Sequence, residues 1–285
     1  MSKTNRRQFA KTLIPLGLSL GAQSFATPLD LPIGLQLGTV DRDCQTDLDG
    51  TLREIARIGY RDVEAYTRLF KIPAEDFRRK LEDHGIKSSS AHYGMDIVQS
   101  DWPRQVEYAH RLGLSYMTCS SLGTLRGALD GFRRAAEVFN NAAALCRSAG
   151  IRFCYHNHNY EFREYDGIVA YDELLRRTDG KLVSMELDCF WVTEAGKDPA
   201  RYLETYPDRF VMLHIKDLKP KGPDGKHPEG NPFTEVGSGV IDWIRIFKTA
   251  RKARVSHYFV EQDRCDRAPL ESVRISYEYL RRLNV

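Results

Sequence analysis

Three features that would each define a class of protein are missing from this sequence. No glycine-rich dinucleotide turn follows the first apolar segment, where the chain reads Gly38-Thr39-Val40. No two cysteines have the CxxC spacing of zinc or redox sites. No basic run with interleaved aromatic residues, as in nucleic-acid-binding proteins, follows residue 26. These absences argue against a dinucleotide-binding sheet, a cysteine-ligated zinc or redox protein, and a nucleic-acid-binding protein.

The chain also has little net charge. Its 285 residues include 42 Lys and Arg and 39 Asp and Glu, which gives a formal charge of +3. Four of the basic residues precede Gly17, and no acidic residue precedes Asp30. Without that leader the balance is 38 minus 39, or −1. A polyanion would gain little from such a surface, so a metal-dependent endonuclease is disfavoured and a small carbohydrate is the better candidate partner.

Residues 1–26 have the three-part pattern of an export signal. A basic start precedes an apolar stretch at 13–20, and small residues precede Ala26. The apolar stretch is too short to span a bilayer permanently. Arg6-Arg7 and the residues after them resemble the bacterial twin-arginine signal. We therefore predict a cleaved signal peptide and a periplasmic protein that is free of the membrane; a short basic tail is the alternative.

From Pro32 onward, short apolar segments alternate with amphipathic segments that have helical spacing. The expected strands are 33–38, 61–66, 86–92, 115–120, 151–156, 182–188, 210–216 and 258–262. Strands that alternate with helices pair in parallel through right-handed crossovers. Eight such units predict one (β/α)8 TIM barrel over residues 32–285, in preference to an open doubly wound sheet. Cys119, Cys154 and Cys189 lie in apolar segments, so we expect mostly free, buried thiols.

Ionisable side chains stand at or just after the ends of the expected strands. They are Glu64, His92, His156, His158, Glu161, Glu186, Asp188, His214, Lys216 and Glu261. The C-terminal strand ends form the active-site face of a TIM barrel, and residues two positions apart on a strand point the same way. Carboxylates combined with imidazoles suit one divalent ion such as Mn²⁺, Co²⁺, Zn²⁺ or Mg²⁺. The sequence therefore predicts a metal site at the barrel mouth.

Several of these residues also have structural alternatives. Asp188 could cap the segment after its strand, His214 could be a core histidine, and Glu261 could pair with Arg264. Lys216 fits either a counter-ion to the acids or a ligand for a substrate oxygen. The remaining histidines are expected at the surface; they are His84, His110, His227 and His257.

Five ordered segments resemble the sugar phosphate isomerase/epimerase family, which has a xylose isomerase-like barrel. They are YHNHNYEF (155–162), MELDCFWVTEAGKDP (185–199), LHIKDLK (213–219), EVGSGVIDW (235–243) and YFVEQD (258–263). The resemblance implies one metal ion held by Glu, Asp, His and Glu from strands five to eight. Asp188, His214 and Glu261 match that pattern, whereas His156 stands in place of the first glutamate. The sequence does not decide whether His156 or His158 is the ligand from strand five.

The resemblance implies an isomerase or epimerase that acts on a sugar or keto-sugar by proton abstraction. The candidate catalytic residues are Glu261, His156, His158 and Lys216. The candidate substrate-binding residues are Glu64, His92, Glu161, Glu186 and Trp191, of which Glu64 and Glu186 fit a supporting role equally well. A homo-oligomer is compatible with the sequence, which does not define one.

The histidine at position 156 removes one of the two carboxylate bases that epimerases use. A dehydratase or lyase that works by β-elimination, similar to inosose dehydratase-like relatives, is therefore the main alternative. A periplasmic sugar-binding protein without catalysis is the alternative from another class. Phosphate on the substrate is not expected, because the segment 217–240 offers lysines and Gly237-Ser238-Gly239 but no arginine.

Overall fold

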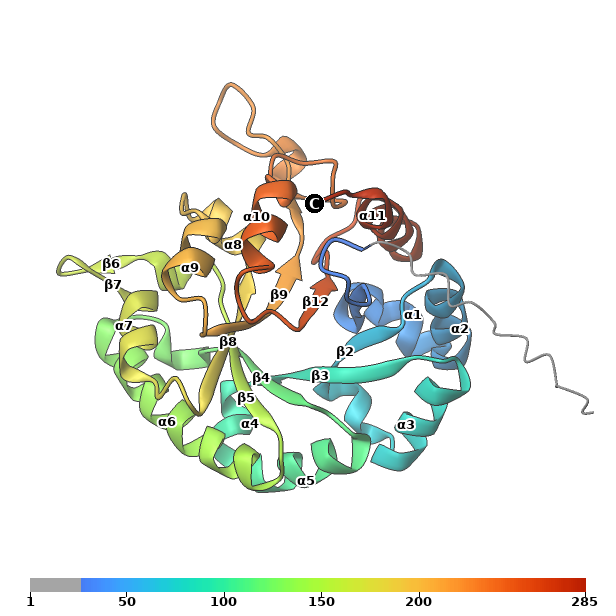
Figure 1. The fold of residues 1–285 in the computed structure, drawn as a ribbon, viewed down its shortest axis with the longest axis horizontal. Coiled ribbons are helices and arrows are strands. Elements are labelled where there is room, and N and C mark those ends of the chain that lie inside the picture. Colours follow the sequence, from blue (N-terminus) through green and yellow to red (C-terminus); the bar gives the residue numbers. More distant parts are fainter. Residues whose placement is uncertain (1–26) are drawn as a thin grey trace, which may run out of the picture.

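Eight parallel strands close into a barrel in the computed structural model, which describes residues 27–285 (Figure 1). They are β1 (Gly34–Gln36), β2 (Asp62–Tyr66), β3 (Lys87–Gly94), β4 (Tyr116–Ser121), β5 (Arg152–His156), β8 (Val183–Asp188), β9 (Phe210–Ile215) and β12 (His257–Val260). Their order around the barrel is β1-β12-β9-β8-β5-β4-β3-β2. The predicted (β/α)8 TIM barrel is confirmed. The predicted signal peptide lies outside the described residues.

Helices surround the barrel as an outer ring (Figure 1). They are α1 (Asp41–Thr46), α2 (Leu48–Ile58), α3 (Ala74–Asp83), α4 (Met95–Ser100), α5 (Trp102–Leu112), α6 (Leu129–Ser148), α7 (Ala170–Arg177), α8 (Cys189–Glu194), α9 (Pro199–Thr205), α10 (Trp243–Ala250) and α11 (Pro269–Arg282). Short 3₁₀ turns are η1 (Leu37–Val40), η2 (Thr67–Lys71), η3 (Gly123–Leu125), η4 (Tyr160–Phe162) and η5 (Pro228–Gly230). Within residues 27–285, none of the helices has the length and apolar character needed to cross a bilayer.

The eight predicted strands all form, with bounds within two residues of those expected. The first strand ends early because the chain turns at η1, where the Gln36 side chain accepts a hydrogen bond from the Gly38 N–H at 2.8 Å. Two small antiparallel hairpins were not expected: β6 (Glu164–Tyr165) with β7 (Ile168–Val169), and β10 (Asp217–Leu218) with β11 (Phe233–Thr234). Strands of two residues are too short to give a periodic signal.

The helix before β5 illustrates how the sequence directs the chain into the site. Helix α6 buries Ala135, Phe139 and Cys146 at helical spacing against the barrel. The chain then reverses at Gly150, whose φ of 74° suits a residue without a side chain. Strand β5 follows two residues later and carries the site histidines. All six cysteines have free thiols, as expected.

The interior of the barrel changes from apolar to ionisable along its axis. Cys154, Met212 and Phe259 form a small apolar cluster inside the barrel. The Phe259 ring fits there because a Cβ on Gly34, in the adjacent strand, would lie 2.4 Å from it. Two residues further along the same three strands come the site residues, which are His156, His214 and Glu261. Strand alternation thus places them directly above this apolar layer.

A buried carboxylate holds the segment that leads into α10. Asp217 accepts hydrogen bonds from the Gly237 N–H at 2.8 Å, the Ile241 N–H at 3.2 Å and the Trp243 Nε1–H at 3.0 Å. Its Oδ1 also accepts from the backbone N–H of Leu218 at 2.9 Å. The resemblance segment 235–243 is therefore wrapped around one side chain, so its glycines serve this turn.

Asp217→Asn should destabilise the protein by about 2–4 kcal/mol, because an amide cannot accept all of these hydrogen bonds and turns a donor towards at least one buried N–H. Urea denaturation with two probes measures the change. Asp242→Asn is the matched control: Asp242 caps the exposed start of α10 through the Arg245 N–H, and its loss should cost about 1 kcal/mol. Equal losses in both variants would contradict the central role of Asp217.

Candidate metal centre and active site

Four side chains from four adjacent strands converge at the C-terminal end of the barrel. One ligand atom each from His156, Asp188, His214 and Glu261 lies within 4.8 Å of the others. His156 Nε2 is 3.1 Å from Asp188 Oδ2 and 3.2 Å from His214 Nδ1. His214 Nδ1 is 3.0 Å from Glu261 Oε2 and 3.8 Å from Asp188 Oδ2. The structure thus brings together the four residues that the sequence predicted as metal ligands.

The structural role considered for Asp188 from the sequence is present in the structure, whereas the one considered for Glu261 is not. Asp188 does cap a helix, because its Oδ1 accepts from the Trp191 N–H at 2.9 Å at the start of α8. Its Oδ2 remains directed into the four-residue group, so the helix cap fixes the orientation of the carboxylate and leaves this second oxygen available as a ligand. Glu261 does not pair with Arg264; its Oε2 contacts His214 and Lys216 instead.

The donor set and its spacing fit a divalent ion. A tetrahedral ion with ligands at about 2.0–2.2 Å has ligand atoms about 3.3–3.6 Å apart, close to the 3.0–3.8 Å of the four pairs given above; all four ligand atoms lie within 4.8 Å of one another. Two carboxylates and two imidazoles converge here, and the Lys216 ammonium balances only one of the two carboxylate charges in this buried site, so a further cation would be favourable there. Such mixed nitrogen and oxygen donors suit Zn²⁺, Mn²⁺ or Co²⁺.

The Glu64 carboxylate orients the His214 imidazole through the ring nitrogen that does not face the metal group. Its Oε2 lies 2.6 Å from His214 Nε2 and accepts from Gln36 Nε2 at 2.9 Å. Its Oε1 accepts from Ser90 Oγ at 2.6 Å. A carboxylate on one ring nitrogen leaves the other nitrogen as a metal donor. Glu64 is fully buried, so the geometry gives it this supporting position, while the substrate-binding role stays a prediction.

His92 and Glu186 complete the layer beneath the metal group. His92 Nε2 is 2.9 Å from both Glu64 Oε2 and Glu186 Oε2. Burial alone would lower the pKa of His92, but these two carboxylates outweigh it and raise the pKa to about 9. Burial and the charge of Glu64 raise the pKa of Glu186. These two residues also form a second close group of potential donors with His156 and His214.

Lys216 supplies the fixed positive charge of the site. Its Nζ lies 3.1 Å from Asp188 Oδ2, 2.5 Å from Glu261 Oε2 and 2.8 Å from Asp263 Oδ2. Although burial opposes its charge, these three carboxylates raise the pKa of Lys216 well above its ordinary value. Asp263 was not predicted; its place two residues after Glu261 in the segment YFVEQD was the available signal.

His158 and Trp191 present polar atoms that lack partners. The His158 ring stacks on Tyr160 at 5.5 Å and lies 5.5 Å from Trp191. Among residues 27–285, His158 Nδ1 and Trp191 Nε1 are buried without a hydrogen bond, an unfavourable state that a bound ligand could relieve. Burial, with help from Lys216, lowers the pKa of His158 to about 4, so its imidazole is neutral.

Glu161 is buried behind His158 and faces the protein. It accepts a hydrogen bond from Tyr155 and, through both carboxylate oxygens, from the His158 N–H at 3.0 Å. Burial is the main cause that raises its pKa to about 7. The geometry therefore makes Glu161 a support for the strand-five turn; its predicted contact with substrate is untested.

Two histidines expected at the surface are instead partly buried and paired. His257 Nδ1 lies 2.9 Å from Asp62 Oδ2 at the start of β12, and His227 Nε2 lies 3.1 Å from Glu194 Oε2. A lone histidine gives no periodic signal, so the sequence could not reveal these partners. Neither belongs to the metal group.

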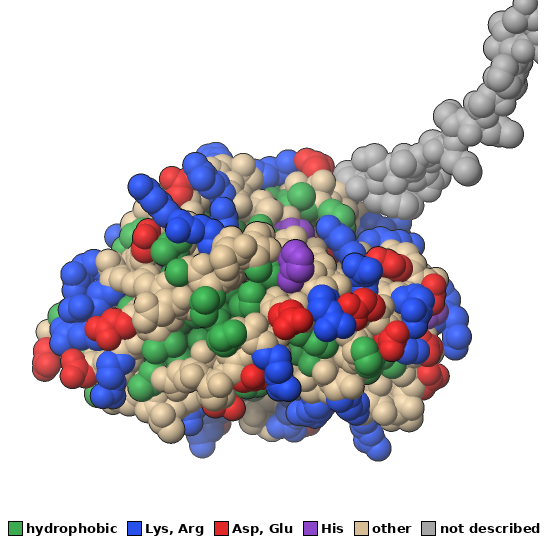
Figure 2. Space-filling model, turned by 90° about the horizontal axis from the view of Figure 1, so that it is seen from below, with side chains coloured by type: hydrophobic (Ala, Val, Ile, Leu, Met, Phe, Trp, Pro, Cys, Tyr) green, Lys and Arg blue, Asp and Glu red, His purple; other side chains and the backbone are tan. Residues whose placement is uncertain are grey.

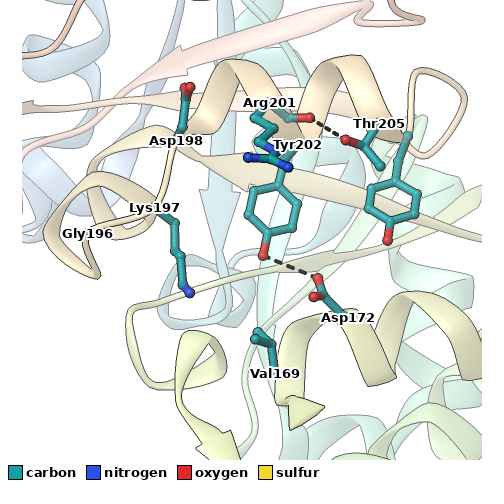
Figure 3. A pocket seen from close by; sticks show the side chains of 9 residues that line it. Val169, Asp172, Gly196, Lys197, Asp198, Arg201, Tyr202 and Thr205 are labelled. Atoms are coloured by element: carbon teal, nitrogen blue, oxygen red, sulfur yellow. Dashed lines mark hydrogen bonds between the residues drawn. The ribbon is translucent and has the colours of Figure 1, made fainter. Parts of the chain in front are cut away.

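Other hollows lie away from this chemistry. A pocket of about 460 Å³ between α7 and α9 is lined by Asp172, Lys197, Arg201 and Tyr202, with the Tyr202 hydroxyl on Asp172 at 3.2 Å (Figure 3). It contains none of the predicted site residues. The face in Figure 2 intersperses basic with acidic side chains around apolar ones, which is unlike the continuous basic surface of a nucleic-acid-binding protein.

The chain belongs to the xylose isomerase-like TIM barrel family, because the sequence model of that family matches residues 52–283. An inosose dehydratase from Geobacillus kaustophilus (strain HTA426) is 26% identical over 272 residues, covering 82% of this chain and 87% of that protein.

Solved structures share the same fold. A sugar phosphate isomerase/epimerase from Parabacteroides distasonis is 27% identical with a TM-score of 0.76, covering 87% of this chain and 93% of its own. An IolI protein with a bound zinc atom is 15% identical with a TM-score of 0.70, covering 87% and 96% of the two chains; at that identity only the fold is shared.

Metal analysis of purified variants tests the four-residue group. The wild type should hold about one divalent ion per chain, and Asp188→Asn should lose it while its remaining oxygen still caps α8. Glu64→Gln should retain the site with affinity weakened about 10- to 100-fold. Asp62→Asn, a buried carboxylate at the other end of the barrel, serves as the control. Metal content that is equal in Asp188→Asn and the wild type would refute the assignment.

Glu161 should make stability depend on pH. Its pKa is about 7 in the folded protein against 4.5 as the ordinary value, so the folded state holds the proton more tightly. The stabilisation is complete below pH 4.5 and is lost as pH rises through 7, by up to about 3 kcal/mol. Glu161→Gln cannot titrate, so its stability relative to the wild type should rise between pH 5 and 8 in urea titrations. A pH-independent difference would contradict the raised pKa.

Proposed function

We propose that this protein is a divalent-metal-dependent enzyme that removes the proton beside the carbonyl of a keto-sugar and then expels a substituent from the next carbon. This reaction is a dehydratase or lyase reaction by β-elimination. Isomerisation or epimerisation through the same first step is the second candidate. The substrate is a small carbohydrate, and export to the periplasm by the twin-arginine route is part of the proposal.

The observation that carries the choice is the presence of one accessible glutamate. The Glu261 side chain is 13% exposed, whereas those of Glu64 and Glu186 are 0% exposed. Epimerisation at one carbon requires an acid and a base on opposite faces. With His156 in the position of the second glutamate, the site offers one accessible glutamate as base, while the more exposed Asp263 carboxylate is paired with Lys216. The imidazole and ammonium groups suit a leaving group or an oxyanion.

The geometry supports a separate catalytic role for the metal ligands, for Glu261 and for Lys216. When bound by His156, Asp188, His214 and Glu261, the metal ion supplies Lewis acidity that polarises a substrate carbonyl. Glu261 takes the proton from the adjacent carbon; a glycine at position 38 leaves room beside its Oε1. The Lys216 ammonium holds the developing oxyanion and keeps its own proton.

The leaving group departs on the side of the aromatic wall. Trp191 Nε1–H has no partner in the described structure and can donate to the departing oxygen. The neutral His158 imidazole can donate a hydrogen bond to the same oxygen, and the proton that Glu261 removed from the carbon returns to the departing oxygen through water. The carbon–oxygen bond breaks as the carbon–carbon double bond forms, so the products are an unsaturated ketone and water or an alcohol. Phe190 and Phe233 pack around Trp191 at 4.8 and 5.7 Å and keep its ring in place.

The relatives support both candidates and favour elimination. The inosose dehydratase from Geobacillus kaustophilus covers most of the chain, and a probable 3-DHS dehydratase shares the fold. The isomerase/epimerase from Parabacteroides distasonis supports the second candidate. The IolI protein, which shares the fold, binds a zinc atom.

Proton exchange in D₂O tests the proposal. We expect the metal-loaded wild type to exchange the proton beside the carbonyl of 2-keto or 3-keto sugars, followed by nuclear magnetic resonance. Enone absorbance should appear when the next carbon carries a leaving group. Glu261→Gln should lower both rates by about 100-fold or more, and His158→Ala should lower elimination more than exchange. His227→Ala, outside the site, should match the wild type.

Each outcome has a distinct meaning. Exchange without an enone product would favour the isomerase or epimerase. Absence of exchange in metal-loaded protein that still binds sugar after chelation would refute the enzyme and favour a sugar-binding protein.

A further inference from the structure

A small pocket beside the barrel mouth is lined by two arginines and no acid. It measures about 380 Å³ and is formed by Arg126, Asn159, Tyr160 and Arg163. Arg126 follows η3, after β4, and the other three lie in or beside η4, after β5. Within residues 27–285, neither guanidinium forms an ion pair with a carboxylate. The pocket therefore holds two positive charges that the described protein does not neutralise.

A series of ring contacts, one edge-to-face and one stacked, connects this pocket to the metal group. The His158 ring lies 5.1 Å from His156, and Tyr160 stacks on His158 at 5.5 Å with an interplanar angle of 12°. The Arg126 guanidinium lies 5.9 Å from the centre of the Tyr160 ring, a cation–π arrangement that orients it without cancelling its charge. The Tyr160 hydroxyl accepts from the Leu122 N–H at 3.3 Å, which ties the stack to the loop after β4.

The segment where TIM barrels often bind phosphate is already satisfied internally. Lys219 pairs with Asp266, and Lys221 lies 3.6 Å from Glu194. The Gly237 N–H donates to Asp217. The lysines and glycines that the sequence offered for an anion after strand seven are thus largely occupied, whereas the two arginines after strands four and five are not.

We infer that Arg126 and Arg163 form a subsite for an oxyanion, a carboxylate or a phosphate, on the part of the substrate remote from the metal. Guanidinium groups bind both anions through paired hydrogen bonds. The inference rests on the proposed function, because it assigns an acidic sugar to the same site. Asn159 adds a polar contact to the lining of the same pocket.

A second basic pocket provides a matched control. It measures about 390 Å³ and is lined by Arg147, Arg152 and Lys181 at the opposite, N-terminal end of the strands. Its cations would attract anions at low ionic strength, but in the described part of the chain no series of ring contacts connects them to the metal group. Arg152→Ala therefore removes the same charge from a place where it should not affect a substrate at the mouth.

The test compares three sugars with the same keto group and different ends: D-fructose, D-fructose 6-phosphate and D-fructuronate. Calorimetric titrations use metal-loaded wild type, Arg126→Ala, Arg163→Ala, the double variant and Arg152→Ala, at about 0.15 M salt so that distant charges are screened. We expect one acidic sugar to bind at least about fivefold more tightly than D-fructose to the wild type. The tighter of the two identifies the anion as phosphate or carboxylate.

That preference should fall in each single variant, vanish in the double variant and persist in Arg152→Ala. No preference in the wild type, a preference retained in the double variant, or an equal loss in Arg152→Ala would overturn the subsite. The titrations are run beside the D₂O exchange assay, with Asp188→Asn as the variant that should lose the metal, so that failure of the subsite can be distinguished from failure of the proposed function. If the wild type shows the preference without proton exchange, the proposed function fails; exchange without the preference refutes only the subsite.

Discussion

The site depends on one buried imidazole that contacts carboxylates through both of its nitrogens. His214 can direct the lone pair of Nδ1 at a metal only if Nε2 carries the ring hydrogen, and Glu64 Oε2, at 2.6 Å from Nε2, favours that form. Glu64 is in turn fixed by Gln36 and Ser90. These three residues are cross-strand neighbours on β1, β2 and β3, so barrel closure itself sets the ligand geometry.

The buried negative charge of the carboxylates explains why the site favours a cation and which residues would bind it. Glu64 and Glu186 share His92 in the lower layer, and Lys216 neutralises part of the upper layer. The Asp188 and Glu261 oxygens also lie 3.0–3.8 Å from the His156 and His214 imidazoles, and the one ammonium, which Asp263 shares, compensates only part of their charge. Uncompensated carboxylates in a low-dielectric interior are costly. A divalent ion among the four ligands would restore the balance, with Lys216 beside it rather than in its place.

The fold and the upper part of the site could be predicted because both follow from simple periodicity. Eight apolar segments alternate with helices, and pairs such as His214 and Lys216 lie two positions apart at a strand end. The depth of Glu64 and Glu186 could not be predicted. Strand register shifts beside each of them, between Val63 and Glu64 and between Met185 and Glu186, and one-residue shifts in pairing change how deep a side chain lies.

The arginine subsite was hidden for a different reason. Arg126 and Arg163 lie in loops whose paths depend on the helices beneath them, so no spacing in the sequence brings the two together. In the described structure the two arginines lack carboxylate partners, which becomes informative only by comparison with Lys219 and Lys221, which have them. The sequence offered the lysine-rich segment after strand seven for an anion, and tertiary pairing removed most of that possibility.

The histidine on strand five connects these features. A glutamate at that position would give the ligand set three negative charges, whereas His156, kept neutral by burial, leaves two. A divalent ion is then balanced by its protein ligands, and an oxyanion that develops on the substrate meets no excess negative charge. The same neutrality makes an acidic substrate easier to accommodate near the metal. Replacement of a carboxylate base by an imidazole ligand therefore favours elimination over two-base epimerisation and also removes an electrostatic barrier to a negatively charged sugar.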